Sequence, residues 1–369
     1  MKRGSVIKRG KGWRIKFDAE PINGKRQQRY ETFHGTKSDA HKRLRELLHD
    51  ADKGTLPEPN HQTVGEYLTA WLGMTHEQSP KTLERYRELV ANQIVPHLGG
   101  IKLQKLKPEH VQAWHRRLLD SGLAPRTIGH AHRLLNKVLG VAVKNGTLAR
   151  NVVGVHQPPK AEDTEIEILT SEQVVDVLTA LEGNALFAIV SLALATGMRR
   201  GELLGLQWGD IDLESGTLKV ERAVEETSAG LRLKPPKTKR GRRNISLPSE
   251  AVTMLRARKV QQMETRLVLG QGQVRTDTLV FSNIEGGLMR PRNVSKAWWR
   301  LVTSHSLPRV SLHSLRHTHV SMLINAGVDI LTISRRLGHS KAAITLDVYG
   351  HLVVGADAAA AKAIEGLFV

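Results

Sequence analysis

The chain of 369 residues is long enough for two or three domains, and its 40% hydrophobic content excludes a chain that is disordered by composition. Lys and Arg total 55 against 36 Asp and Glu, and the net charge of +19 favours nucleic acid over a small molecule as the partner. Cysteine is absent, which excludes disulfides, thiolate nucleophiles and Cys-based zinc sites, and no apolar run could span a bilayer, so we expect a cytoplasmic protein without membrane contact.

The first block of the chain, residues 1–56, is strongly basic. Residues 1–29 carry ten Lys or Arg and two Asp or Glu, a local charge of ten minus two, +8. Alternating apolar and basic residues over Gly12–Phe17 predict a strand with one cationic face, Asn23-Gly24 signals a hairpin turn, and a second strand follows near Gln28–Phe33. A helix begins at Ser38, so the block predicts a small sheet packed on one helix, and its aromatic residues favour a DNA-binding module over a solvated tail. The candidate DNA contacts in this block are Arg14, Lys16 and Arg29.

A helical region follows the linker Pro57–Asn60 and extends from Thr63 to about Asn151. Its apolar residues recur at helical spacing, and separate helices are expected over residues 79–99, from Pro108, and over Arg126–Lys144. We expect an all-helical domain over residues 61–156. Its helix surfaces carry several cations, which serve either DNA binding or solubility, and the candidate DNA contact among them is Arg126.

A larger domain, residues 163–369, follows a second linker at Gln157–Lys160. Its pattern is mostly helical, with an insert in which Thr217–Glu225 and Gly230–Pro248 are predicted as strands of one basic antiparallel sheet. The expected fold class is therefore a multidomain, mainly α protein with small β-sheets: two or three strands and a helix first, an all-α domain next, and an α+β domain last.

Two stretches of the last domain suit the binding of phosphate. An apolar helix stops at Thr196-Gly197, and Arg199 stands close to the start of the next helix, where Glu202 could hold the arginine or satisfy the helix end. Residues 232–243 then hold seven cations and no acid, and Lys237 follows two prolines near a predicted hairpin tip. Most of these cations are expected only to grip phosphates, and the candidates for this are Lys239 and Arg242.

Histidine and tyrosine mark the end of the last domain. His313 and Arg316 are three residues apart, hence neighbours on a helix face. His313 and His317 have the spacing of zinc ligands, but Ser314 stands where the metalloprotease pattern needs Glu, so no metal site is predicted. Leu337-Gly338-His339 follows, and ten residues after His339 comes Tyr349, which is either a functional phenol or a core residue with a satisfied hydroxyl.

Taken in this order, the motifs resemble the tyrosine recombinase (phage integrase) family over essentially the whole chain. They are Thr-Gly-x-Arg-x-x-Glu at 196–202, Lys on a basic hairpin, His-x-x-Arg at 313–316, Leu-Gly-His at 337–339, and Tyr349. Met198 and Ser314 depart from the commoner residues of that pattern at positions without a chemical role. The resemblance implies an arm-type DNA-binding domain over residues 1–56, a SAM-like core-binding domain over 61–156 and a catalytic domain over 163–369.

The resemblance also implies a mechanism without metal, ATP or other cofactor. Tyr349 would attack a DNA phosphorus and form a 3′-phosphotyrosine. Arg199, Arg316 and His339 would bind the non-bridging oxygens. Lys237 would protonate the leaving 5′-oxygen, His313 would handle the tyrosine proton, and Glu202 would support the site.

The partners implied are double-stranded DNA with core and arm attachment sites, and a homotetramer assembled on that DNA. An excisionase and a host DNA-bending protein are candidate accessory partners. The expected function is integration and excision of a phage or other mobile element at the bacterial nucleoid. Two alternatives stay open: a non-enzymatic regulator, because residues 326–338 suit a helix-turn-helix, and a type IB topoisomerase, which uses the same chemistry.

Overall fold

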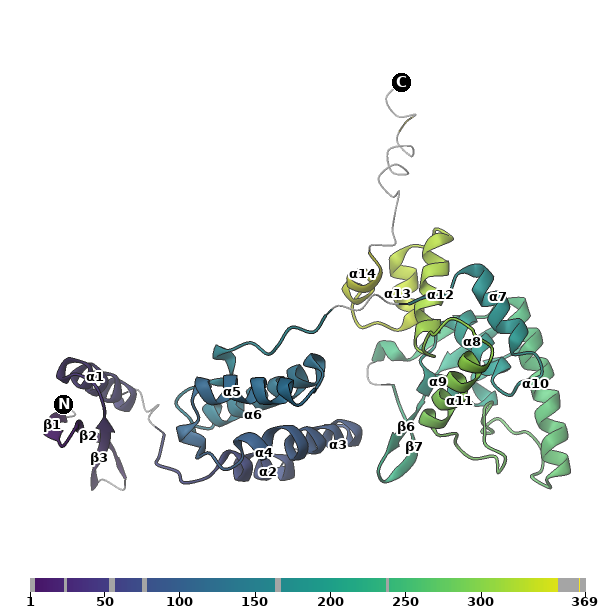
Figure 1. Ribbon diagram of the computed structural model, residues 1–369. Coiled ribbons are helices and arrows are strands. Elements are labelled where there is room, and N and C mark those ends of the chain that lie inside the picture. The colour runs from purple at the N-terminus through teal and green to yellow at the C-terminus, as the bar shows by residue number, and fades with distance from the viewer. Residues whose placement is uncertain are drawn as a thin grey trace. The chain divides into compact units, whose positions relative to one another are not determined.

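The computed structural model describes residues 4–22, 25–52, 57–74, 78–162, 167–236, 239–350 and Glu365. These residues divide into two compact units, Met1–Asp163 and Thr164–Val369 (Figure 1). The predicted mainly helical fold with small antiparallel sheets is confirmed. The division into three domains stays a prediction, because the two units do not separate residues 1–56 from 61–156. The predicted turn at Asn23-Gly24 and position 237 lie outside the described residues.

The chain opens with a three-stranded antiparallel sheet followed by one helix. Strands β1 (Gly4–Arg9), β2 (Gly12–Ile22) and β3 (Lys25–Phe33) pair in that order, and α1 (Lys37–Asp52) covers one face. The sheet side of this small core comes from Ile15 and Phe17. The helix contributes the apolar residues at its buried positions: Ala40, Leu44 and Leu47. Burial of this face is what stabilises so small a sheet.

The rest of the first unit is a helical bundle around Trp114, whose indole N–H donates to the Gln93 carbonyl at 2.7 Å. The predicted helix over 79–99 forms as one path with a π-helical turn at Val90–Ile94, where Pro96 lacks the N–H that an α-helix needs. The helices of the bundle are α2 (Val64–Met74), α3 (Pro80–Leu89), α4 (Val95–Leu98), α5 (Pro108–Asp120) and α6 (Pro125–Lys144), with short 3-10 turns at Leu103–Lys105 and Val153–Val155.

The second unit packs helices around a core that includes Trp298 and the apolar helix α8. Figure 1 shows its last helices, α12 to α14, gathered at one end of the unit. The helices are α7 (Ser171–Ala180), α8 (Phe187–Thr196), α9 (Arg200–Leu204), α10 (Ser249–Val268), α11 (Pro291–Ser304), α12 (Ser314–Asn325), α13 (Ile330–Leu337) and α14 (Ala343–Tyr349), with 3-10 turns at Trp208–Asp210 and Lys239–Gly241.

The strands of the second unit form two sheets, so the prediction of one basic sheet was wrong. One sheet has the order β4-β5-β8 and the other is the hairpin β6-β7. Strands β7 and β8 belong to different sheets and therefore do not form a hairpin with each other. The strands are β4 (Ile211–Asp212), β5 (Thr217–Val220), β6 (Ala223–Thr227), β7 (Gly230–Lys234) and β8 (Arg243–Ser246).

Candidate active site

Arg199 and Glu202 form a reciprocal cap at the start of α9. The Arg199 backbone N–H donates to Glu202 Oε2 at 3.0 Å, and its Nη1 donates to Glu202 Oε1 at 2.9 Å. The carboxylate therefore does both things expected of it: it satisfies the helix end and holds the arginine. The Arg199 side chain is 42% exposed, so its remaining N–H groups can reach a ligand.

A second arginine, which the sequence did not single out, shares the same carboxylate. Arg243, at the start of β8, donates from Nη2 to Glu202 Oε2 at 2.9 Å and from Nε to the Arg336 carbonyl at 2.6 Å. Burial by itself raises the pKa of Glu202, but the hydrogen bonds and charges of Arg243 and Arg199 outweigh it and hold the pKa below its usual value. Glu202 is thus an anion that fixes two guanidinium groups.

Arg316, in the first turn of α12, is only 3% exposed. It donates from Nη1 to the Gly197 carbonyl at 2.6 Å, and from Nη2 to the Leu337 carbonyl at 2.8 Å and His339 Nε2 at 3.0 Å. Burial, followed by the charge of Arg199, lowers its pKa to about 9, which still leaves a cation at neutral pH. The close approach of the Arg316 guanidinium to the chain at position 197 depends on glycine there. Gly197 has a φ of +63°, and a Cβ at this position would lie 2.6 Å from the His319 ring.

The tautomer of His339 follows from its partners. A guanidinium can only donate, so Nε2 accepts from Arg316 and the ring hydrogen is on Nδ1, which donates to Thr345 Oγ1 at 2.8 Å. Burial and the charges of Arg316, Arg199 and Arg243 lower the pKa of His339 to about 4. In this arrangement His339 is neutral and orients Arg316.

Tyr349, the last residue of α14, is 3% exposed and packs against Val320, Ile333 and Leu337. Its hydroxyl forms a 2.6 Å hydrogen bond with Nδ1 of His317 on α12. Burial raises the pKa of Tyr349 to about 12, and the charge of nearby Arg316 opposes this only in part. The phenol is therefore protonated and tied to an imidazole.

His313, the residue expected to handle the tyrosine proton, lies one step further from the phenol. It caps α12, and its ring meets the His317 ring edge-on, with ring centroids 5.0 Å apart. Burial, and after it the charges of Arg316, Arg199 and Arg200, lower the pKa of His313. His317 is thus a site residue that sequence reasoning set aside, because its spacing from His313 raised only the question of zinc.

The other candidates of the basic insert lie near this cluster or outside the described residues. Lys237 is outside them, and Lys239 begins a 3-10 turn whose next residue, Arg240, donates to the Ser340 carbonyl. Arg242 is exposed and its Nε lies 3.5 Å from Glu221 Oε2, which leaves it open to a ligand at the surface.

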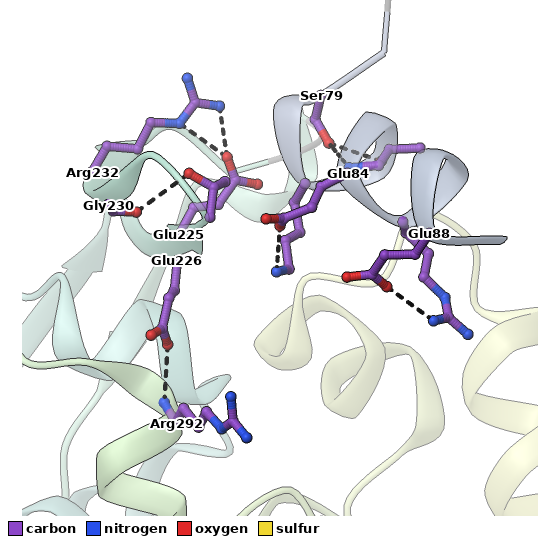
Figure 2. A network of polar contacts seen from close by, with 12 residues as sticks. Ser79, Glu84, Glu88, Glu225, Glu226, Gly230, Arg232 and Arg292 are labelled. Atoms are coloured by element: carbon purple, nitrogen blue, oxygen red, sulfur yellow. Dashed lines mark hydrogen bonds and ion pairs between the residues drawn. The ribbon is translucent and has the colours of Figure 1, made fainter. Parts of the chain in front are cut away.

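A basic pocket beside α9 is a further feature that sequence reasoning missed. Cations at a spacing of four residues put Arg292, Lys296 and Arg300 on one face of α11, and this spacing could have revealed it. The backbone N–H of Arg292 donates to Glu226 on β6, while the neighbouring Glu225 holds Arg232, as Figure 2 shows. The pocket is lined by Arg200, Arg292, Ser295, Lys296, Trp299 and Arg300.

Among the candidate DNA contacts of the first unit, Arg14 and Arg126 are exposed, whereas Lys16 and Arg29 are half-buried. Arg14 and Lys16 lie on the sheet face away from α1, and the Arg14 guanidinium stacks over Tyr30 at 5.2 Å. Arg29 pairs directly with Phe17, so its side chain lies on the same face as Phe17, the face covered by α1, and not on the face of Arg14 and Lys16. There it donates to the Pro57 carbonyl at 2.6 Å. Arg126 is exposed in the first turn of α6.

The described residues offer neither a cluster of metal ligands nor a helix that could span a membrane. No group of three or more His, Asp or Glu side chains among them could hold a metal ion. Among the described helices, none combines the length and the apolar character that crossing a bilayer requires.

Comparison with known proteins identifies the family of the chain. The sequence pattern of the Phage integrase family matches residues 167–354, and that of the phage integrase N-terminal SAM-like domain matches residues 63–119. The chain therefore belongs to the phage integrase family of tyrosine recombinases, which are DNA strand-exchange enzymes, as the sequence motifs predict.

Relatives come from several bacteria. An integrase of Streptomyces ambofaciens is 30% identical over 347 residues, covering 90% of this chain and 87% of its own length. A protein named tyrosine recombinase XerC-like from Caldanaerobacter subterraneus subsp. tengcongensis is 28% identical over the full length of both chains. The ICEBs1 integrase of Bacillus subtilis is 26% identical over 75% of each chain.

Solved structures share the fold. A Tn1549 transposon integrase in complex with transposon right end DNA has a TM-score of 0.73 at 21% identity, covering 83% of this chain and all of that one. A lambda integrase tetramer bound to a Holliday junction has a TM-score of 0.57 at 18% identity, covering 90% of this chain and 91% of that one.

Proposed function

We propose that this recombinase cleaves and rejoins DNA through a 3′-phosphotyrosine on Tyr349, and that Arg199 and Arg316 bind the reacting phosphate. The observation that carries the proposal is the meeting of these groups in one unit. Tyr349 is hydrogen-bonded to His317, the residue after Arg316 on α12, and Arg316 donates to the carbonyl of Gly197, two residues before Arg199. A buried phenol beside several cations, which outnumber their one shared carboxylate, is suited to an anionic substrate.

The proposed step is an exchange of two phosphodiester bonds. The Tyr349 oxygen gives its proton to a histidine of the site and forms a bond to phosphorus, the bond to the 5′-oxygen breaks, and that oxygen takes a proton from Lys237. The free 5′-hydroxyl of the same or another strand then attacks the phosphotyrosine and returns its proton to Lys237, while the phenol leaves and regains its own proton from the histidine. Bond energy is conserved throughout, so the chemistry needs neither ATP nor a metal.

The arginines supply charge stabilisation in the transition state. Arg199 offers exposed N–H groups from a fixed cap. Arg316 has five N–H bonds, of which three are used on Gly197, Leu337 and His339, leaving two without a partner among the described residues. His339 would contribute mainly by holding Arg316, and a bond from His339 to the phosphate needs its Nε2 to gain a proton.

For partners, we propose double-stranded DNA with core and arm attachment sites. The SAM-like domain over residues 61–156 would bind core DNA, and residues 1–56 would bind arm DNA through the cationic face of Arg14 and Lys16. Solved relatives are described as bound to circular intermediate DNA and, as a tetramer, to a Holliday junction. We further propose that the protein acts as a homotetramer on DNA at the bacterial nucleoid, and that an excisionase and a host DNA-bending protein are its accessory partners.

The test is covalent adduct formation. The full chain is incubated with a labelled duplex that spans the junction between the element carrying the gene and its flanking DNA, nicked so that the cleaved end diffuses away. We expect an adduct with the wild type and none with Tyr349→Phe, while a gel shift shows unchanged binding. Tyr67→Phe is the matched control and should form the adduct. An adduct on Tyr349→Phe contradicts the proposal.

A further inference from the structure

The hydroxyl of Tyr349 has one hydrogen-bond partner among the described residues, His317 Nδ1 at 2.6 Å. If Nδ1 carried the ring hydrogen, the buried phenolic O–H would have no acceptor, which is costly. The phenol therefore donates, Nδ1 accepts, and the ring hydrogen of His317 is on Nε2. This geometry aims a lone pair at the proton that must leave when Tyr349 attacks.

We propose that His317 is the general base that takes the phenolic proton from Tyr349, an assignment that rests on Tyr349 being the nucleophile proposed above. As the phenolic oxygen bonds to phosphorus, its proton moves to Nδ1 of His317 and forms an imidazolium. When the 5′-hydroxyl later displaces the tyrosine, the imidazolium returns that proton to the leaving phenolic oxygen. One complete cycle of strand cleavage and rejoining therefore returns His317 to its neutral state.

The surroundings of His317 suit a base that strengthens when DNA binds. The groups that face it are Tyr349, His313, Arg316 and His339. Burial, with the charges of His313 and Arg316, lowers the pKa of His317 to about 4, so the ring is neutral and ready to accept in the free protein. A phosphate bound by the arginines adds negative charge nearby and raises the affinity of the ring for a proton.

His313 has a different place in this arrangement. The rings of His313 and His317 meet at right angles with their centroids 5.0 Å apart, and among the described residues the phenolic hydroxyl is hydrogen-bonded to His317 and not to His313. We assign it a positioning role, in which it holds the plane of the His317 ring. The two histidines therefore make different predictions when each is replaced by the same residue.

The experiment compares His317→Asn with His313→Asn in the full chain, using single-turnover adduct formation on the nicked junction duplex from pH 6 to pH 9. The Asn amide oxygen can occupy the place of Nδ1 and keep the hydrogen bond, but it cannot take the proton. We expect His317→Asn to slow adduct formation by about 100-fold or more at pH 7, with a rate that rises steadily towards pH 9 as hydroxide replaces the base. His313→Asn should keep the wild-type pH profile.

A second arm lowers the demand for a base. Trifluorotyrosine at position 349 has a more acidic phenol, so it should recover much of the rate lost in His317→Asn. A His317→Asn rate within threefold of wild type, or an unchanged pH profile with no gain from trifluorotyrosine, overturns the proposal. If Tyr349→Phe forms no adduct in the same assay, such a result removes His317 alone; if it does form one, the nucleophile is wrong. Gel shifts and circular dichroism verify that each variant binds DNA and is folded.

Discussion

Replacing Glu202 by Gln tests whether one carboxylate organises the arginines of the site. Gln keeps the shape of the side chain and removes its charge. The native carboxylate is 4% exposed and accepts hydrogen bonds from the Arg199 backbone, the Arg199 side chain and Arg243. In the variant, half of the terminal group becomes an N–H donor that faces other donors.

The size of the effect follows from the exposure of the two arginines. The Arg243 side chain is 6% exposed, and removing one partner of such a buried pair costs about 3–5 kcal/mol because the other charge stays buried. Arg199 is 42% exposed and can be hydrated, so its ion pair adds only about 0–1 kcal/mol. We expect the free energy of unfolding of the second unit to fall by about 3–5 kcal/mol, within the ~5–15 kcal/mol of a typical domain.

The chemistry should suffer separately from the stability. Without Glu202, Arg199 loses the contact that fixes its guanidinium, and adduct formation by folded protein should slow by roughly 10- to 100-fold. The free energy of unfolding is measured by denaturant titration, followed by circular dichroism. The cleavage rate is measured without denaturant, as adduct formation on the nicked junction duplex, at a temperature at which the variant is folded.

The matched control is Glu225→Gln. Glu225 is also a buried carboxylate with two cationic partners, Arg232 at 2.6 Å and Lys234, but Arg232 is 48% exposed and can turn to solvent (Figure 2). We expect a smaller loss of stability and a cleavage rate close to wild type. If Glu202→Gln matches Glu225→Gln in both measurements, the carboxylate does not hold the arginines and our account of the site is incorrect.

Two further outcomes are expected in the first unit. Burial, with the charge of His132, lowers the pKa of His115 to about 4, below the value near 6.5 of the unfolded chain. The neutral ring therefore contributes its full stabilisation above pH 6.5. As the pH falls to 4.5, we expect the free energy of unfolding to decrease by about 2–3 kcal/mol. The loss is measured as the free energy of opening from hydrogen exchange of α5 and α6 at pH 6.5 and pH 4.5, and equal protection at both pH values contradicts the prediction. Arg14→Ala with Lys16→Ala should weaken arm-DNA binding and reduce the slope of log affinity against log salt by about 2, whereas Lys42→Ala with Arg45→Ala should not; equal slopes for the two double variants refute the assignment.

The sequence could predict groups that act within one segment. The spacing of Arg199 and Glu202 predicts a contact between them at a helix N-terminus, and in the structure Glu202 accepts hydrogen bonds from the Arg199 backbone and side chain. The share of Arg243 in the same carboxylate could not be predicted, because it depends on β8 returning beside α9 after 41 residues. The partner of Tyr349 was hidden for the same reason: only the packing of α14 against α12 brings His317 to the phenol.

Strand pairing shows the same limit. Alternation over residues 217–248 predicts strands, because the side-chain period of a strand is local. It does not tell which strands pair, since the partner is chosen by long-range packing, and β5 pairs with β8 while β6 pairs with β7. The basic face of α11 was missed differently: its three cations at a spacing of four are visible in the sequence, but only the structure puts them beside Arg200.

The three arginines of the site are held in three ways, and this decides what each can do for an anion. Arg243 is buried against a carboxylate, so its charge is largely neutralised and its role is structural. Arg199 shares that carboxylate but keeps N–H groups in solvent. Arg316 has no carboxylate hydrogen-bonded to it among the described residues; it is held by the carbonyls of Gly197 and Leu337.

Those two carbonyls lie at the ends of α8 and α13, and both helices finish with a left-handed glycine, Gly197 and Gly338. Carbonyls at a helix C-terminus carry partial negative charge, which stabilises a cation without cancelling it. Arg316 is therefore oriented before any ligand arrives and retains its full charge. A substrate phosphate would be the first full anion to hydrogen-bond to it, which is the condition under which a buried guanidinium contributes most to a transition state.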